Sequence, residues 1–148
     1  HIDLHTDRGR THPLKEIFFP YKRVHSVLFG RVSIPVAKIF LKGREEIAVD
    51  AIVDSGAVIS IFPRSLSDLL KLNFAEGEKG EVRTATGEVI GIRVHRVRMR
   101  IGDYAFTARV AFSDNENIPY VLGRLDIIDK VEIRLEREGT RFLIHKVD

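Results

Sequence analysis

Asp54 is the residue of this chain whose surroundings most suggest chemistry, because it follows an apolar stretch and precedes Ser55 and Gly56. An aspartate that leaves a buried strand is desolvated unless hydrogen-bond donors are supplied. Gly56 lets the backbone turn tightly and bring N–H groups to the carboxylate, and the Ser55 hydroxyl can fix the loop. Asp-Ser-Gly is also a common surface turn, but here Ile52-Val53 and Ala57-Val58-Ile59 flank it with apolar residues. We therefore predict a catalytic role for Asp54, supported by its two neighbours.

Other kinds of site fit the sequence less well. The Gly-x-Ser-x-Gly nucleophile motif, the His-Glu-x-x-His zinc motif and a Gly-rich phosphate loop are absent. The chain has no cysteine, which excludes disulfides and thiolate metal ligands. Asp50 and Asp126 are the nearest rival carboxylates, but they lack the loop context of Asp54, and we interpret both as structural or solvent-exposed. No metal ion and no organic cofactor is expected.

The elements that must position Asp54 are predicted to be β-strands. Alternation of apolar residues over residues 47–53 predicts a strand that runs directly into Asp54. Other strands are predicted at residues 32–41, 81–84, 89–101, 105–112, 131–135 and 141–146. Short helices are predicted at residues 65–72, which begin with a near capping box, and at residues 125–129. Closely spaced short strands with little helix predict an all-β, closed barrel-like fold with one or two short helices.

A length of 148 residues fits a single domain. Residues 1–20 begin with a polar stretch without periodicity, and we predict a disordered N-terminal tail or tag remnant there. The domain itself is predicted at residues 21–148. Over residues 15–31 aromatic side chains stand beside basic ones. We expect these aromatics to pack on the domain while the cations remain solvated.

Charge and hydropathy give no indication of a nucleic-acid partner or of a membrane span. A net charge of +3 and an isoelectric point of about 9.3 are too small a bias to indicate nucleic-acid binding. Arg96, Arg98 and Arg100 make one strand face cationic; we interpret this face as solvated, with a polyanion-binding surface as the alternative, and expect no nucleic-acid partner. No apolar run reaches the roughly 18 residues of a membrane span, so none is predicted. The compartment stays unassigned, with the cytoplasm as the default expectation and an anchor upstream of His1 left open.

Three segments resemble motifs of the retropepsin-like aspartic proteases, in the same order and at similar spacing. Asp54-Ser55-Gly56-Ala57 resembles the active-site loop Asp-[Thr/Ser]-Gly-Ala. Residues 84–91 resemble the flap hairpin. Val121-Leu122-Gly123-Arg124 resembles the second motif, in which two apolar residues and a glycine open a short helix; its glycine follows Asp54 by 123 − 54 = 69 residues. The resemblance covers roughly residues 26–143 and suggests a single-domain cellular or prokaryotic relative of this family.

The resemblance implies a retropepsin-like β-barrel and a homodimeric endopeptidase, in which two Asp54 carboxylates, one from each subunit, activate a water molecule. One carboxylate acts as general base on the water, and the other protonates the carbonyl oxygen of the scissile bond. A chain with one such motif can form the pair only with a second copy of itself, across a two-fold axis. The expected partners are this second subunit and a peptide or protein substrate. The other residues that the resemblance assigns are Ala57, Ala85, Thr86 and Gly87 for substrate binding, and Leu122, Gly123 and Arg124 for the structural second motif.

Val58 departs from the viral members of the family, in which an aspartate at this position commonly pairs with the arginine after the second glycine. Arg124 therefore needs another acidic partner or solvent. The alternative function is a catalytically silent dimerisation and peptide-binding module on the same fold, because a fold does not determine an activity. The intact Asp54 loop favours the enzyme.

Overall fold

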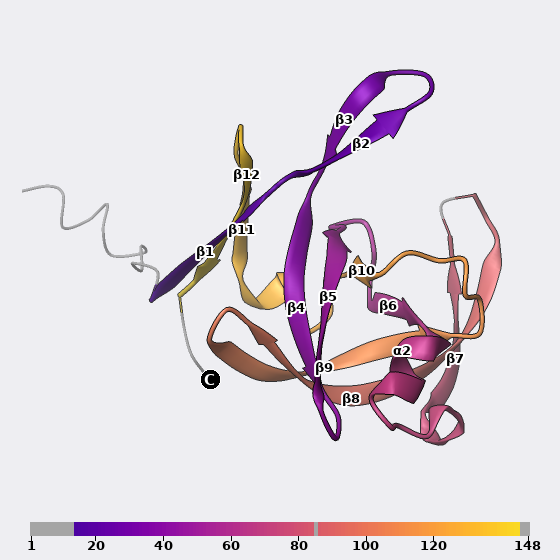
Figure 1. The fold of residues 1–148 in the computed structure, drawn as a ribbon. Coiled ribbons are helices and arrows are strands. Elements are labelled where there is room, and N and C mark those ends of the chain that lie inside the picture. The colour runs from indigo at the N-terminus through magenta and orange to yellow at the C-terminus, as the bar shows by residue number, and fades with distance from the viewer. Residues whose placement is uncertain (1–13, 85, 146–148) are drawn as a thin grey trace, which may run out of the picture.

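A computed structural model describes residues 14–84 and 86–145 of the chain, which form mainly β-strands (Figure 1). The strands are β1 (Lys15–Pro20), β2 (Lys22–Ser26), β3 (Gly30–Ile34), β4 (Val36–Lys42), β5 (Glu46–Val53), β6 (Ser60–Pro63), β7 (Glu78–Arg83), β8 (Val89–Ile101), β9 (Tyr104–Ser113), β10 (Val121–Leu122), β11 (Glu132–Leu135) and β12 (Gly139–Ile144). The helical segments are α2 (Arg64–Leu69) and the 3-10 turns η1 (Phe74–Glu76) and η2 (Ile128–Lys130). No helix within the described ranges is long and apolar enough to cross a membrane. The prediction of an all-β fold with short helices is confirmed.

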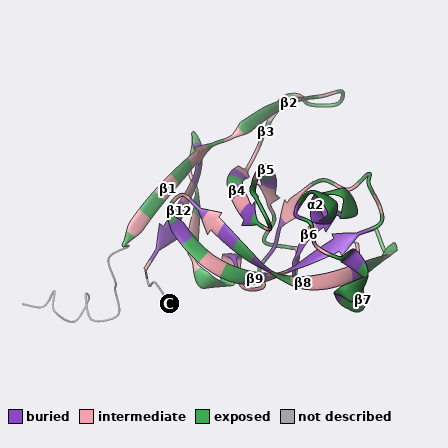
Figure 2. Cartoon of the chain, turned by 60° about the horizontal axis from the view of Figure 1, so that its bottom comes forward, coloured by how far each residue is buried: buried purple, intermediate pink, exposed green. Residues whose placement is uncertain are grey.

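The largest sheet closes into a barrel. Its strand order is β4-β5-β10-β6-β9-β8-β7, and β4 also pairs with β8, so the strands from β4 round to β8 form a ring from which β7 extends. Alternate residues of β4 point inward, and Ala37, Ile39 and Leu41 are fully buried. Phe62 of β6 and Phe112 of β9 fill the same core. Figure 2 shows the buried residues concentrated in the barrel strands. Closure leaves the barrel strands with few free edges, and it provides a rigid frame for the end of β5.

A second sheet joins the two ends of the described chain. β1 pairs antiparallel with β12, which also pairs with β11. Ile17 and Phe19 of β1 pack against the barrel core, and the ring of Phe19 meets that of Phe142 edge-on at 5.5 Å. Because these alternating apolar side chains bind β1 to the domain, the predicted tail of residues 1–20 extends too far. Residues 1–13 of that prediction lie outside the described residues.

Pro35 divides one predicted strand into two. Residues 32–41 form the end of β3 and most of β4, because proline lacks the N–H that a continuous ladder needs. The Pro35 carbonyl instead accepts a hydrogen bond from the Val53 N–H at 3.0 Å. β2 and β3 form a two-stranded hairpin that projects from the barrel (Figure 1). Its turn carries Phe29, which is 75% exposed, so the prediction that this aromatic packs on the domain is wrong.

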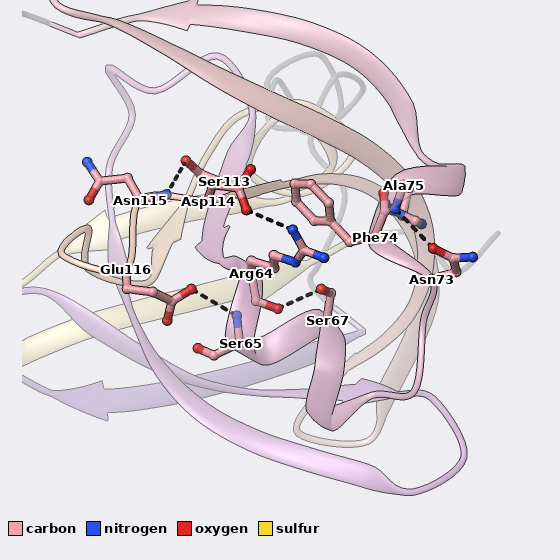
Figure 3. Close-up of polar contacts among 11 residues, drawn as sticks. Arg64, Ser65, Ser67, Asn73, Phe74, Ala75, Ser113, Asp114, Asn115 and Glu116 are labelled. Atoms are coloured by element: carbon pink, nitrogen blue, oxygen red, sulfur yellow. Dashed lines mark hydrogen bonds and ion pairs between the residues drawn. The ribbon is translucent and has the colours of Figure 1, made fainter.

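Helix α2 follows β6 and is shorter than the helix predicted at residues 65–72. The expected capping box is not formed. Instead the Glu116 carboxylate accepts a hydrogen bond from the Ser65 N–H at 3.1 Å (Figure 3). Arg64 pairs with Asp114 at 2.9 Å beside it. The loop after β9 thus replaces the local cap, and the other predicted helix is a run of turns that ends in η2.

One of the three arginines on the predicted cationic face of β8, Arg100, is paired with an acid of the described chain. Arg100 pairs with Glu46 at 2.8 Å, and its guanidinium lies over the Phe40 ring at 3.9 Å from the centroid. Arg96 lies opposite Arg109 of β9, whose guanidinium is itself bound to an aspartate. Arg100 of β8 and Arg109 of β9 are therefore paired with acids of the same chain. This favours an ordinary solvated strand face over a polyanion-binding surface.

Candidate active site

The Asp54 loop begins where β5 ends. The Asp54 N–H donates to the Leu122 carbonyl at 3.0 Å and continues the parallel pairing of β5 with β10. The Ala57 N–H donates to the Asp54 carbonyl at 3.1 Å and closes the turn. The Gly56 N–H donates to Asp54 Oδ1 at 2.9 Å and fixes the direction of the carboxylate. Asp54, Ser55 and Gly56 are all exposed. The carboxylate is thus oriented by its own loop and open to a ligand or a second chain.

Gly123 allows the second motif to lie directly on the Asp54 loop. A Cβ atom at this position would come within 2.5 Å of the Ile59 carbonyl carbon, which is too close for any side chain. The Gly123 N–H donates to the buried Ser60 hydroxyl at 2.8 Å. The N–H groups of the next two residues donate to the carbonyls of Ala57 and Val58 at 2.9 and 2.8 Å. These bonds join the two motifs into one unit.

Asp126 anchors the segment after the second motif to the barrel. Its carboxylate accepts hydrogen bonds from the Arg109 side chain at 2.8 and 3.0 Å and from the Arg109 backbone N–H at 3.0 Å. Hydrogen bonding to the Arg109 guanidinium lowers the pKa of Asp126 to about 2. The Asp126 side chain is 17% exposed. Its role is structural, and the other rival carboxylate, Asp50, is exposed.

We expect Asp126→Asn to lower the free energy of unfolding by about 2 kcal/mol near neutral pH. Because the folded-state pKa lies below the ordinary value of 3.8, this stabilisation is present above about pH 4 and is lost as the pH falls toward about 2. Asparagine tolerates the φ of 62° at this position, so the backbone is not strained. Urea unfolding of wild type and variant across this pH range tests the expectation, and a difference that does not shrink on acidification contradicts it.

A groove of about 730 Å³ lies between the Asp54 loop and the β7–β8 hairpin. One side is formed by the loop and β6, and the other by the two strands of the predicted flap. The lining residues are Asp54, Gly56, Ala57, Val58, Ile59, Ile61, Glu81, Val82, Arg83, Thr84, Ile90, Ile118, Pro119 and Val121. Most of these side chains are apolar, so the groove can hold an extended chain with apolar side chains beside the carboxylate.

The turn of the β7–β8 hairpin is closed by its own polar groups. The Thr84 N–H donates to the Glu88 carbonyl at 2.8 Å, and the Gly87 N–H donates to the Thr84 carbonyl at 2.9 Å. Gly87 has a φ of 90°, a backbone conformation that residues with a side chain rarely adopt. Of the flap residues predicted to bind substrate, Thr86 and Gly87 lie in this turn and do not line the groove. Ala85 lies outside the described residues.

The structure brings together most of the residues predicted around the candidate catalytic residue. Gly56 and Ala57 line the groove beside the carboxylate. Leu122 and Gly123 are buried behind the loop. Arg124 is exposed, and no acidic side chain of the described ranges lies within ion-pair distance of it. The absence of the viral-type aspartate at position 58 thus leaves this arginine facing solvent.

The sequence-based predictions missed the apolar walls of the groove. Val82 and Ile90 lie opposite each other in the flap hairpin, so strand alternation could have indicated an apolar face there. Ile118 and Pro119 come from the loop before the second motif, where no local pattern points to the groove. Among the described residues, Glu81 is the carboxylate that lines the groove in addition to Asp54. No group of three His, Asp or Glu side chains in those residues is placed to hold a metal ion.

Comparison with known proteins agrees with this geometry. A model of the aspartyl protease family matches residues 38–124, more than half of the chain. The structure is similar to a retropepsin-like aspartic protease from Rickettsia conorii, with a TM-score of 0.61 and 12% identity over 88% of this chain and 99% of that one. It is also similar to EIAV protease complexed with the inhibitor HBY-793, with a TM-score of 0.52 and 18% identity over 72% of this chain and 92% of that one. Comparison with curated protein sequences gives no significant match. The chain belongs to the aspartyl protease family and has the retropepsin-like fold.

Proposed function

We propose that the protein is an aspartic endopeptidase that acts as a homodimer, with the Asp54 carboxylates of two chains facing each other across a two-fold axis. The observation that carries the proposal is the exposed and oriented Asp54 loop. Its carboxylate is held by the Gly56 N–H beside a groove that can hold a peptide, in a chain that has one such loop. Val58 next to it is apolar yet 63% exposed, which favours burial of this edge by a second chain.

In such a dimer the two Asp54 carboxylates share one proton, because two neighbouring like charges repel; aspartic proteases are the standard example of this arrangement. The ionised carboxylate takes a proton from water as the water oxygen attacks the scissile carbonyl carbon, and the protonated carboxyl gives its proton to the carbonyl oxygen. The tetrahedral diol then collapses as the C–N bond breaks. The leaving nitrogen takes one proton from the pair, and a diol hydroxyl returns one, so the pair regains its starting state. Ser55, which is exposed beside the carboxylate, supports the two loops across the axis.

The groove favours an extended peptide with apolar side chains next to the cleaved bond. Val82 and Ile90 on the flap side and Ile118 on the other side would contact these side chains. The peptide main chain can bind as an added strand along the groove. We place substrate-binding roles on Ala57 and, when the flap closes over the peptide, on Ala85, Thr86 and Gly87.

The proposal is tested by mixing wild-type protein with Asp54→Asn chains and following cleavage of a peptide library. If the site needs one Asp54 from each chain, mixed dimers are inactive. Subunit exchange then leaves about half of the activity at equal concentrations and about a tenth at a tenfold excess of the variant. Asp50→Asn, a change at an exposed acid of the same strand, is the matched control and should not inhibit. Activity that stays constant as Asp54→Asn chains are added would locate a complete site in one chain and sink the dimer mechanism.

The alternative function is a silent module that binds peptides in the same groove without cleaving them. It predicts that a pepstatin-like transition-state mimic binds, as measured by calorimetry, while no peptide of the library is cleaved between about pH 3 and about pH 8. The intact hydrogen bond between Gly56 and the Asp54 carboxylate favours the enzyme. Cleavage that the same mimic inhibits excludes the silent module.

A further inference from the structure

The β2–β3 hairpin stands apart from the rest of the domain. Its two strands form a sheet of their own within the described residues, and the hairpin extends away from the barrel (Figures 1 and 2). The aspartyl protease family model matches residues 38–124, so the hairpin lies outside the matched region. An isolated two-stranded hairpin is at best marginally stable in water. A further surface that packs on it would therefore stabilise it.

The turn of this hairpin presents three consecutive apolar side chains to solvent. Val27, Leu28 and Phe29 are 100%, 79% and 75% exposed. Within the turn the Phe29 N–H donates to the Ser26 hydroxyl oxygen at 3.2 Å. Gly30 follows with a φ of 72°, as expected for a three-residue hairpin loop. A hydrogen-bonded turn thus presents three apolar side chains to water, which is the pattern of a contact surface.

The strands of the hairpin have one apolar and one basic face. Val24 lies opposite Val32, and Ile34 lies on the same face one pair nearer the base, opposite the exposed Lys22. None of these three belongs to the apolar clusters of the described domain. The opposite face carries three exposed basic side chains, which are Arg23, His25 and Arg31. Apolar side chains are therefore found at the tip and, beyond the Ser26–Gly30 pair, along the same face toward the base.

The base of the hairpin lies beside the Asp54 loop. β3 continues through Pro35 into β4, whose first residue, Val36, lies opposite Ile52 of β5. The Pro35 carbonyl accepts a hydrogen bond from the Val53 N–H at 3.0 Å. Because β4 and β5 are antiparallel, β3 extends beyond the end of β5 at which Asp54 stands (Figure 1). Its five residues reach about 17 Å past this point. A second chain whose Asp54 meets this one therefore lies alongside the hairpin.

We propose that the β2–β3 hairpin is a dimerisation arm that packs its apolar face and tip on the second copy of the chain. The inference rests on the homodimer proposed above and adds a contact that the Asp54 loop does not supply. A lipid surface could bind the tip, but it would leave Val24 and Val32 uncovered, because they lie on the strands behind the tip. A second chain covers the tip and the face together, and two-fold symmetry provides the contact twice.

The first experiment identifies what the tip touches. Because the chain has no cysteine, a single Leu28→Cys substitution can carry a benzophenone photocrosslinker. Dimers are formed from isotopically heavy and light chains and irradiated, and the cross-linked peptides are identified by mass spectrometry. We expect peptides that join a heavy chain to a light chain. Cross-links found only within one chain overturn the inference.

The second experiment measures dimer affinity by sedimentation equilibrium. Leu28→Asp combined with Phe29→Asp should raise the dimer dissociation constant about 100-fold, because both arms lose apolar contacts. Arg23→Gln combined with Arg31→Gln, on the basic face, is the matched control and should change it less than about fivefold.

The outcomes of these experiments distinguish a failure of the arm proposal from a failure of the proposed function. An unchanged dissociation constant in the double aspartate variant, with a wild type that forms active dimers, overturns the arm and leaves the proposed function standing. A wild type that stays monomeric and is not inhibited by Asp54→Asn chains overturns both. Pelleting with phosphatidylserine vesicles that the double aspartate change abolishes, at an unchanged dissociation constant, assigns the tip to a lipid surface and overturns the arm.

Discussion

Asp54→Asn should reduce the rate of peptide cleavage at least about 10³-fold, because one substitution removes both catalytic carboxylates of the proposed dimer. Asparagine has nearly the same size as aspartate but cannot act as a general base. The Gly56 N–H can still donate to the side-chain oxygen, so the loop should keep its shape. The loss of repulsion between two like charges should leave the dimer at least as stable. The measurement is kcat/KM on a cleaved library peptide, with sedimentation of the same samples.

The control for this variant is Asp50→Asn, which changes an exposed acid of β5 and should keep the wild-type rate. The wild-type rate is expected to be greatest at acidic to weakly acidic pH and to fall on the alkaline side. The reason is that a higher pH removes the proton that the pair shares and uses as its general acid. If purified Asp54→Asn cleaves as fast as the wild type, the activity belongs to other residues or to a contaminant, and the assignment of Asp54 is wrong.

The elements around Asp54 could be predicted because they depend on short-range patterns. The alternation over residues 47–53 corresponds to β5, and the apolar pair before Gly123 corresponds to β10. The contact between the two motifs followed only from the resemblance to a family, since a separation of 69 positions (123 − 54) leaves no local signal of it. In the structure this contact is made by parallel pairing of β10 with β5. Local patterns thus predicted the strands, and the resemblance predicted that the two motifs lie next to each other.

Long-range contacts explain what the sequence did not show. The start of α2 is capped by Glu116, 51 residues away from Ser65, so no capping box could reveal it. The groove walls at Ile118 and Pro119 come from a loop whose path depends on the finished barrel. Phe29 was expected to be packed, because an aromatic residue is usually covered. Its exposure depends on a hairpin that leaves the barrel at Pro35, which residue patterns within the hairpin do not encode.

Gly123→Ala should cause the second large effect, on stability as well as on activity. A Cβ atom at this position would lie 2.5 Å from the Ile59 carbonyl carbon and 2.9 Å from the Ala57 carbonyl oxygen. Both atoms belong to the backbone of the segment that holds Asp54, so the clash can be relieved only by moving that segment. We expect the free energy of unfolding to fall by about 3–5 kcal/mol. Cleavage should also be lost, because the hydrogen bond from the Arg124 N–H to the Ala57 carbonyl positions the loop.

Gly91→Ala is the matched control for Gly123→Ala. Gly91 lies in β8 without a positive φ, and a Cβ atom there would meet nothing within 4 Å. The free energy of unfolding of Gly91→Ala should therefore differ from that of the wild type by less than about 1 kcal/mol. Any change should be stabilising, because alanine restricts the unfolded chain more than glycine does. Urea unfolding is compared at one fixed protein concentration, because the stability of a dimer depends on concentration. Equal stability of the two variants would mean that the loop can move away from the second motif without cost. Close contact with Gly123 would then not be what positions Asp54.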